Sequence, residues 1–145
     1  MRTPSKFFTL VNNSIVRSAP ARIQTDGSYS YKTGISRTAA ILTVDSKEFR
    51  YMKIYFPNEH MNSTESEWAS LLDGLHYSEN KGITCLALEN DCMPVISSIV
   101  FKKPPTNPLF LEYYKYFNSR TTGYTWLGIR WIPREMNRAD DIFRV

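Results

Sequence analysis

The chain has 145 residues, of which 42% are hydrophobic, 14% aromatic and 22% charged. This length and composition predict one folded domain with a single core, and they exclude an intrinsically disordered chain. The net charge of +4 permits a polyanionic partner but does not require one. The two cysteines, Cys85 and Cys92, form neither a disulfide framework nor a zinc-binding pattern.

The same features predict where the protein is found. The sequence contains no apolar stretch of about 18 residues and no apolar signal segment near its start. Two cysteines outside any framework are typical of a reducing compartment. We therefore expect a monomer in the cytoplasm or another intracellular compartment, with no membrane contact.

Residues 1–21 permit two interpretations. Residues 7–11 and 14–17 form an extra hairpin around the turn pair Asn12-Asn13, or the whole segment is an extension laid on the surface of the domain. In both interpretations the main domain covers residues 22–145.

The main domain is predicted to begin with a three-stranded antiparallel meander, after which strands are separated by helices. Such an order favours a mixed sheet with helices on its faces. The predicted elements are strands 22–25, 39–44 and 49–56, a helix from Thr64 to about Lys81, a strand over 83–88, helices over 93–101 and 109–118, a strand over 124–132 and a short terminal helix over 137–145.

Four acidic residues lie at the ends of these predicted elements. Asp26 and Asp91 each follow a strand, whereas Glu67 and Asp140 each lie in the first turn of a helix. Each has an ordinary structural explanation: Asp26 as a turn residue, Glu67 in a capping box with Thr64, Asp91 as an N-cap, and Asp140 at the positive end of a helix.

Considered together, the four acids suggest a metal-binding cluster. If the two strands are neighbours, the four carboxylates converge at one edge of the sheet. Carboxylates so close would repel one another unless a cation compensates their charge. Oxygen ligands suit Mg²⁺ or Mn²⁺. Two such ions about 4 Å apart can hold the attacking and leaving oxygens of a phosphodiester.

Four motifs in the sequence resemble those of ribonuclease H. Residues 25–28, TDGS, resemble the family's opening strand, and residues 64–75 are similar to its NxAEYxALxxGL helix. Residues 88–96 resemble its strand ending in DS, and residues 131–140 resemble the W(V/I)PRExNxxAD ending of the plant-type and retroelement branches. The resemblance to type 1 ribonuclease H extends from about Arg22 to the C-terminus.

This resemblance implies a ribonuclease H-like α/β fold whose five-stranded mixed sheet has the order 3-2-1-4-5. It implies an endonuclease that cuts the RNA strand of RNA–DNA hybrids, with two Mg²⁺ ions, or Mn²⁺ in their place. By motif position the metal ligands and catalytic residues would be Asp26, Glu67, Asp91 and Asp140. The PRE-type ending also suggests a viral, phage or retroelement origin, with a polymerase or reverse transcriptase as a neighbour.

The sequence departs from the family pattern at several positions. Only one residue separates Asn137 from Ala139, where the family usually has two, and this keeps Asp141 open as the alternative fourth ligand. Arg134 and Glu135 stand where many members carry a histidine that is thought to help product release. We therefore expect slower turnover rather than none.

Substrate contacts are expected around the four acids, because a hybrid duplex presents 2′-hydroxyl groups in a wide minor groove. The candidate residues are Ser28, Ser63, Thr64, Cys92 and Arg134. The basic, aromatic stretch 102–115 permits two interpretations: a surface that tracks phosphates, or, as we favour, a linker and a core-packed helix.

Two further functions are compatible with the same fold. One is a nucleic-acid-binding or scaffolding module with weak or no catalysis, which the altered fourth motif and the missing histidine favour. The other is a DNA-cutting or strand-transferring relative, which the TDGS and PRExN motifs disfavour.

Overall fold

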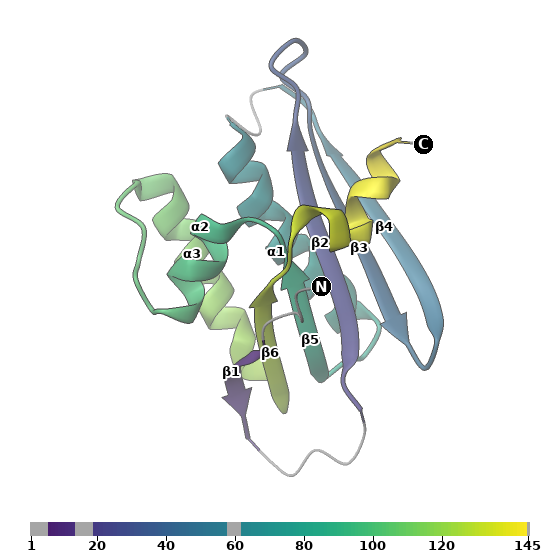
Figure 1. Ribbon diagram of the computed structural model, residues 1–145. Helices are drawn as coiled ribbons and strands as arrows, with labels where there is room; N and C mark the ends of the chain where they lie inside the picture. The colour runs from purple at the N-terminus through teal and green to yellow at the C-terminus, as the bar shows by residue number, and fades with distance from the viewer. Residues whose placement is uncertain (1–5, 14–18, 58–61, 145) are drawn as a thin grey trace.

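The computed structural model describes residues 6–13, 19–57 and 62–144. Within them a six-stranded sheet has the order β1-β6-β5-β2-β3-β4. Helices α1, α2 and α3 cover one face of this sheet (Figure 1). The strands are β1 (Phe8–Asn12), β2 (Ala21–Tyr29), β3 (Ser36–Val44), β4 (Lys47–Tyr55), β5 (Cys85–Asn90) and β6 (Trp126–Trp131).

The helices alternate with the later strands of the sheet: α1 lies between β4 and β5 in the chain, and α2 and α3 lie between β5 and β6. They are α1 (Ser63–Asn80), α2 (Met93–Val100) and α3 (Pro108–Arg120), with three 3₁₀ segments, η1 (Thr121–Gly123), η2 (Arg134–Met136) and η3 (Arg138–Arg144). The segment η3 crosses the face of the sheet opposite the three helices and packs against β2 and β3 (Figure 1). In the described part of the chain, no helix has the length and apolar character needed to cross a membrane.

The prediction of only five strands, in the order 3-2-1-4-5, is wrong in its number of strands, although those five strands, β2 to β6, keep the predicted order. There are six strands, and the added one, β1, pairs antiparallel with β6 and lies at the edge of the sheet. The sequence did not decide whether residues 7–11 form a strand, because a short segment becomes a strand only where another strand offers a free edge for pairing. The second predicted strand of the N-terminal hairpin, residues 14–17, lies outside the described residues.

Several element bounds and one helix type also differ from the sequence prediction. β2 does not end at Thr25 but continues through Asp26 to Tyr29, because β3 pairs with it as far as Ser36. The last segment is a 3₁₀ helix and not an α-helix. Asn62, not Thr64, caps α1, because the Asn62 side chain accepts a hydrogen bond from the Glu65 N–H at 2.8 Å.

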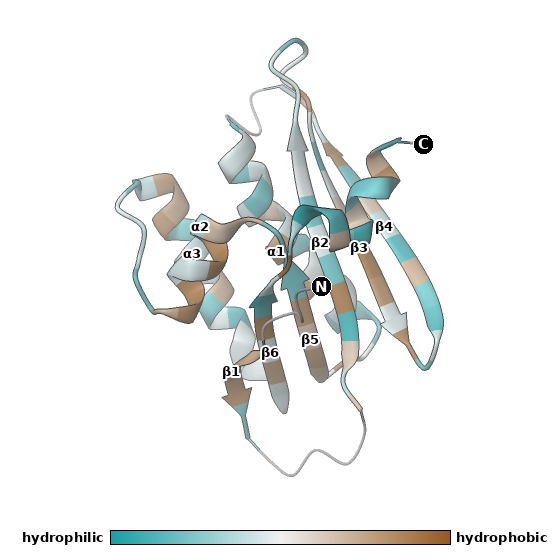
Figure 2. Ribbon diagram, in the orientation of Figure 1, coloured by the Kyte–Doolittle hydropathy of each residue, from teal (hydrophilic) through white to brown (hydrophobic). Residues whose placement is uncertain are grey.

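The core lies between the sheet and the helices. Figure 2 shows hydrophobic residues concentrated on the inner strands, whereas hydrophobic and hydrophilic residues alternate along the edge strand β4. The largest fully buried apolar side chains are Trp68, Phe117, Ile23, Leu42, Leu71, Leu75, Leu86, Leu88, Leu127, Ile129 and Ile132. Four of these, Trp68, Leu71, Leu75 and Phe117, come from the helices and complete the layer above the sheet.

Two glycines allow α1 to lie very close to β2. A Cβ atom on Gly27 of β2 would lie 2.3 Å from the backbone oxygen of Ser66, and one on Gly74 of α1 would lie 2.5 Å from the Thr25 methyl group. Neither contact leaves room for a side chain at normal van der Waals distance. The helix therefore rests directly on the backbone of the strand that carries Asp26.

This contact can be tested by adding one methyl group. We expect Gly27→Ala to lower the free energy of unfolding by about 2–3 kcal/mol, because the methyl group meets backbone atoms that cannot rotate away. Gly123→Ala is the matched control, since a Cβ atom there meets nothing within 4 Å. Urea unfolding of both variants measures the difference; equal stabilities would contradict the close packing.

Candidate metal centre

Three carboxylates from three different elements meet at one edge of the sheet. Asp26 lies in β2, Glu67 in α1, and Asp91 directly after β5. One oxygen from each of them lies within 4.8 Å of the other two. We call Asp26, Glu67 and Asp91 the acid cluster.

The sheet register and the helix contact explain why these side chains converge. β2 and β5 are parallel, and Gln24 is level with Glu89, so Asp26 and Asp91, each two residues later, are also level. Glu67 reaches the same place because α1 rests on Gly27. The Gly27 N–H donates to Glu67 Oε1 at 2.8 Å and to Asp26 Oδ1 at 3.0 Å.

Burial and mutual repulsion make the acid cluster difficult to ionise. Burial, followed by the charges of Asp91 and Asp140, raises the pKa of Asp26 from its ordinary value of 3.8 to about 7. Burial, followed by the charges of Asp26 and Asp91, raises the pKa of Glu67 from 4.5 to about 9. A divalent cation would relieve this crowding of negative charge, so the oxygen donors fit a hard metal ion.

The surroundings of Asp91 oppose the rise of its pKa more than those of the other two acids do. Burial raises its pKa, but a hydrogen bond from Asn137 and the positive charge of Arg134 oppose that shift. Arg134 therefore places a positive charge near Asp91, and it lines the same cavity.

Asp140 faces the acid cluster from η3. It lines the same cavity as Asp26, Glu67 and Asp91, a space of about 470 Å³, and its charge contributes to the raised pKa of Asp26. Its Oδ2 atom accepts a hydrogen bond from Arg144 at 2.7 Å. Asp140 does not belong to the group of three oxygens within 4.8 Å, and Asp141 does not line this cavity.

Most of the chain matches one family of known proteins. Residues 24–143 match the family model described as "Reverse transcriptase-like". The chain belongs to the reverse transcriptase-like family. The prediction of a ribonuclease H-like protein is thereby confirmed, while the plant-type or retroelement branch stays a prediction.

Solved structures show the same fold at low sequence identity. RNase H1 of the archaeon Halobacterium salinarum is 17% identical with a TM-score of 0.77, over 85% of this chain and 93% of that one. The N-terminal RNase H domain of a Mycobacterium tuberculosis protein is 18% identical with a TM-score of 0.75, over 88% and 95%.

A third structure of this fold contains nucleic acid. LC11-RNase H1, isolated from compost by a metagenomic approach and solved in complex with an RNA/DNA hybrid, is 16% identical with a TM-score of 0.73, over 83% of this chain and 91% of that one. A search of curated proteins finds no match.

The predicted substrate-contact residues of this ribonuclease H-like chain all line the cavity of the acid cluster. These are Ser28, Ser63, Thr64, Cys92 and Arg134, and Tyr29 lines it with them. The backbone N–H of Cys92 is already bonded within the protein. It donates to Asn90 Oδ1 at 2.7 Å, and burial and the Glu67 charge raise the thiol pKa of Cys92 to about 12. Cys92 therefore presents a neutral S–H group rather than a backbone donor.

Two buried asparagines hold the cavity together. Asn90 donates to the carbonyl oxygen of Thr25 at 3.0 Å, and Asn137 donates to the same oxygen at 2.9 Å. Both side chains therefore tie their segments to the residue that precedes Asp26. Neither role was predicted from the sequence, although Asn90 stands directly before Asp91 and Asn137 belongs to the fourth motif.

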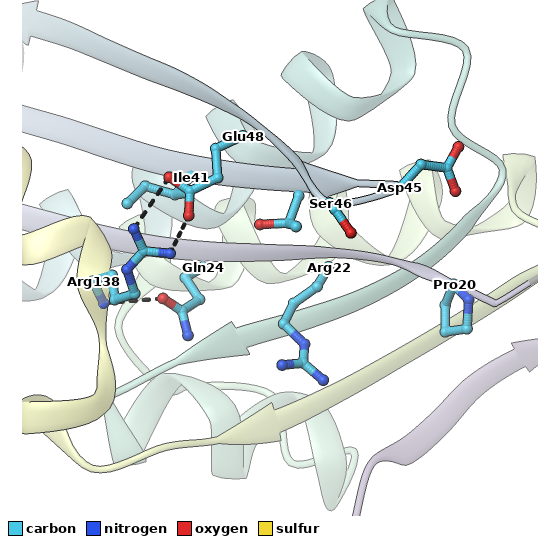
Figure 3. Close-up of a pocket in the computed structure, with 9 residues that line it drawn as sticks. Pro20, Arg22, Gln24, Ile41, Asp45, Ser46, Glu48 and Arg138 are labelled. Carbon is cyan, nitrogen blue, oxygen red and sulfur yellow. Dashed lines mark hydrogen bonds and ion pairs between the residues drawn. The ribbon is translucent and has the colours of Figure 1, made fainter.

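Segment η3, which carries Asp140, is fastened to the open face of the sheet. Figure 3 shows the Arg138 guanidinium paired with both carboxylate oxygens of Glu48 on β4, while the Arg138 N–H donates to Gln24 Oε1 at 3.0 Å. Arg37 of β3 donates to the Phe143 carbonyl at 3.3 Å. These contacts join η3 to three strands and set the position of Asp140.

The basic, aromatic stretch 102–115 includes most of α3, which packs against α1. Phe117, just beyond the stretch, is fully buried, and the Tyr113 hydroxyl donates to Glu65 Oε2 at 3.0 Å. The favoured interpretation of this stretch, a linker followed by a core-packed helix, agrees with these contacts.

The raised pKa values predict how stability depends on pH. Because the folded protein holds protons on Asp26 and Glu67 to a higher pH than the unfolded chain does, these groups lower the free energy of unfolding as pH rises. We expect Glu67→Gln to stabilise the metal-free protein by about 1–2 kcal/mol at pH 8 and by much less at pH 5.

Urea unfolding in the presence of a chelator measures this effect. Glu112→Gln, on the exposed side of α3, is the control and should have the same small effect at both pH values. If Glu67→Gln raised the free energy of unfolding equally at pH 5 and pH 8, ionisation of Glu67 would not be what destabilises the folded protein.

Proposed function

We propose that the protein is a metal-dependent endonuclease that hydrolyses the RNA strand of RNA–DNA hybrids. The observation that carries this proposal is the acid cluster, with oxygens within 4.8 Å, in a cavity that Asp140 also lines. The ribonuclease H-like fold supports it, as does the RNA/DNA hybrid in the structure of LC11-RNase H1.

The acids would hold divalent metal. The donors are carboxylate oxygens without histidine or thiolate, which suits Mg²⁺ or Mn²⁺. Asp26, Glu67, Asp91 and Asp140 would be the ligands. When bound, a pair of such ions would activate water and stabilise the departing oxygen of the phosphodiester, so no protein nucleophile is required.

The other residues of the cavity would orient the acids and the substrate. The Gly27 N–H fixes the Glu67 carboxylate, and Asn137 fixes Asp91 by a hydrogen bond. Arg134, whose charge acts on Asp91, would meet a phosphate of the substrate. These contacts leave the carboxylates oriented before the nucleic acid arrives.

Selection of RNA would depend on hydroxyl groups at the rim of the cavity. Ser28 lies beside the Asp26 end of β2, and Ser63 and Thr64 lie in the first turn of α1. Their hydroxyls can donate to or accept from a 2′-hydroxyl group in the minor groove. We propose that these three residues read the RNA strand.

A nucleic-acid-binding or scaffolding module is the second candidate. The favouring observation is that Asp140 is paired with Arg144 and lies outside the acid cluster. Such a module would bind hybrid in Ca²⁺ yet release no product in Mg²⁺ or Mn²⁺.

A cleavage assay on matched hybrid, double-stranded DNA and double-stranded RNA separates the candidates. We expect Mg²⁺-dependent cleavage of the RNA strand of the hybrid alone, and its loss in Asp91→Asn. Mg²⁺ should also raise the melting temperature of the wild-type protein more than that of the variant. Unchanged cleavage in a folded Asp91→Asn protein would rule out the proposed site.

The fourth ligand can be tested with two neighbouring aspartates. We expect Asp140→Asn to lower the rate by roughly 100-fold, because the lost carboxylate faces the acid cluster. Asp141→Asn should keep about the wild-type rate, since Asp141 lines a different cavity with Arg138 and Arg144. The opposite ranking would transfer the role to Asp141.

A further inference from the structure

The loop that joins β2 to β3 carries an exposed aromatic residue, Tyr31, next to a residue that lines the cavity of the acid cluster. Tyr31 is 80% exposed, the highest value among the large hydrophobic side chains in the described residues that are exposed. Its ring lies 4.8 Å from the ring of Tyr29 in an edge-to-face arrangement at 87°. Tyr29 in turn lines the cavity that contains Asp26, Glu67 and Asp91. An aromatic surface therefore continues outward from the candidate metal centre.

The loop holds Tyr31 in place by its own hydrogen bonds. The Ser30 N–H donates to the Ile35 carbonyl at 3.0 Å, and the Gly34 N–H donates to the Ser30 carbonyl at 2.8 Å. Gly34 has φ of +73°, which suits glycine, and its α-carbon faces Pro57. In Figure 1 this loop projects beyond the end of the sheet. Tyr31 is thus presented to solvent by an ordered turn.

The exposed ring has the chemistry of a base-stacking surface. Burying an aromatic side chain is favourable, and a ring that is 80% exposed gains little of that stabilisation from the fold. Aromatic rings that adjoin a nucleic-acid channel stack on bases whose faces are accessible. Lys32, the next residue, is exposed and offers a positive charge to a neighbouring phosphate.

The distance along β2 indicates which base would be reached. Tyr29 lies three strand residues beyond Asp26, which corresponds to about 10 Å. Stacked bases on one strand are about 3.4 Å apart, so, for a nucleic-acid strand that runs along β2, Tyr31 would meet a base roughly three nucleotides from a phosphate held at the acid cluster. Inside a duplex the faces of that base are covered by its neighbours, so stacking on Tyr31 requires an unpaired base.

We propose that Tyr31, supported by Tyr29, forms a subsite for an unpaired nucleobase, so that the preferred substrate is a hybrid that adjoins a single-stranded segment. This inference rests on the proposed function for the position of the nucleic acid. It adds a substrate class, the junction between hybrid and single strand, to the proposed cleavage.

The affinity for two hybrids in Ca²⁺ tests the subsite. One hybrid is blunt, and the other has the same duplex with single-stranded extensions. We expect the wild-type protein to prefer the extended hybrid by about tenfold, the ratio that one base–aromatic stack supplies. Tyr31→Ala should abolish the preference and Tyr31→Phe should keep it, because the stack needs the ring and not the hydroxyl.

Tyr116→Ala is the matched control. Tyr116 is 45% exposed on α3 and lies against His76, away from the cavity, so its loss should leave the preference at its wild-type value. A 2-aminopurine base in the extension gives a direct readout, since its fluorescence falls on stacking. The fall should occur with wild-type protein and Tyr31→Phe but not with Tyr31→Ala.

Three outcomes would overturn the inference: no preference in the wild-type protein, a preference that survives Tyr31→Ala, or a preference lost in Tyr31→Phe. Cleavage of the blunt hybrid in Mg²⁺, measured in parallel, keeps the two proposals apart. Cleavage without a Tyr31-dependent preference refutes only the subsite. A Tyr31-dependent preference without cleavage refutes only the nuclease, and absence of binding to either hybrid refutes both.

Discussion

The direct contact of α1 with the backbone of β2 is the constraint on which the rest of the structure depends. It exists because Gly27 and Gly74 have no side chains at the two points where helix and strand meet. The same contact places the Gly27 N–H within 2.8 Å of Glu67 and so joins the helix to the acid cluster. One packing requirement thus determines both the position of the largest helix and the position of a candidate metal ligand.

The acid cluster opposes the stability that this packing provides. Asp26 and Glu67 are brought together in a buried place where both have strongly raised pKa values. This electrostatic destabilisation is opposed by buried hydrogen bonds. Asn90 and Asn137 both donate to the Thr25 carbonyl oxygen and so hold the surrounding segments in place. Carboxylates with strongly raised pKa values, kept close together by the surrounding structure, are typical of a functional site.

Asp140 depends on a different part of the structure. Its segment, η3, is a 3₁₀ helix that packs against β2 and β3, with Ala139 as its buried residue. Arg138, paired with Glu48 of β4, and Arg37, bonded to Phe143, fasten the segment to the sheet. The fourth acid is therefore positioned by the packing of η3 on the open face of the sheet, whereas the other three are positioned by the strands themselves and α1.

Local residue patterns were sufficient to identify the acids and most of the elements. Asp26, Glu67 and Asp91 were recognisable because each stands in a short motif of neighbouring residues. Trp68, Leu71 and Leu75 have the spacing of one face of a helix, which is the pattern that α1 requires. These features depend on neighbours in the chain, so they are present in the sequence itself.

The tertiary structure alone decided the features that depend on contacts between distant segments. The place of β1 beside β6, the continuation of β2 to Tyr29 and the choice of Asn62 as the cap all follow from pairing or packing across the fold. The orientation of Asp140 rather than Asp141 toward the acid cluster has the same origin, because Glu48 and Gln24 hold Arg138 across the sheet. The sequence by itself determined which carboxylates were available, and long-range packing determined which of them meet.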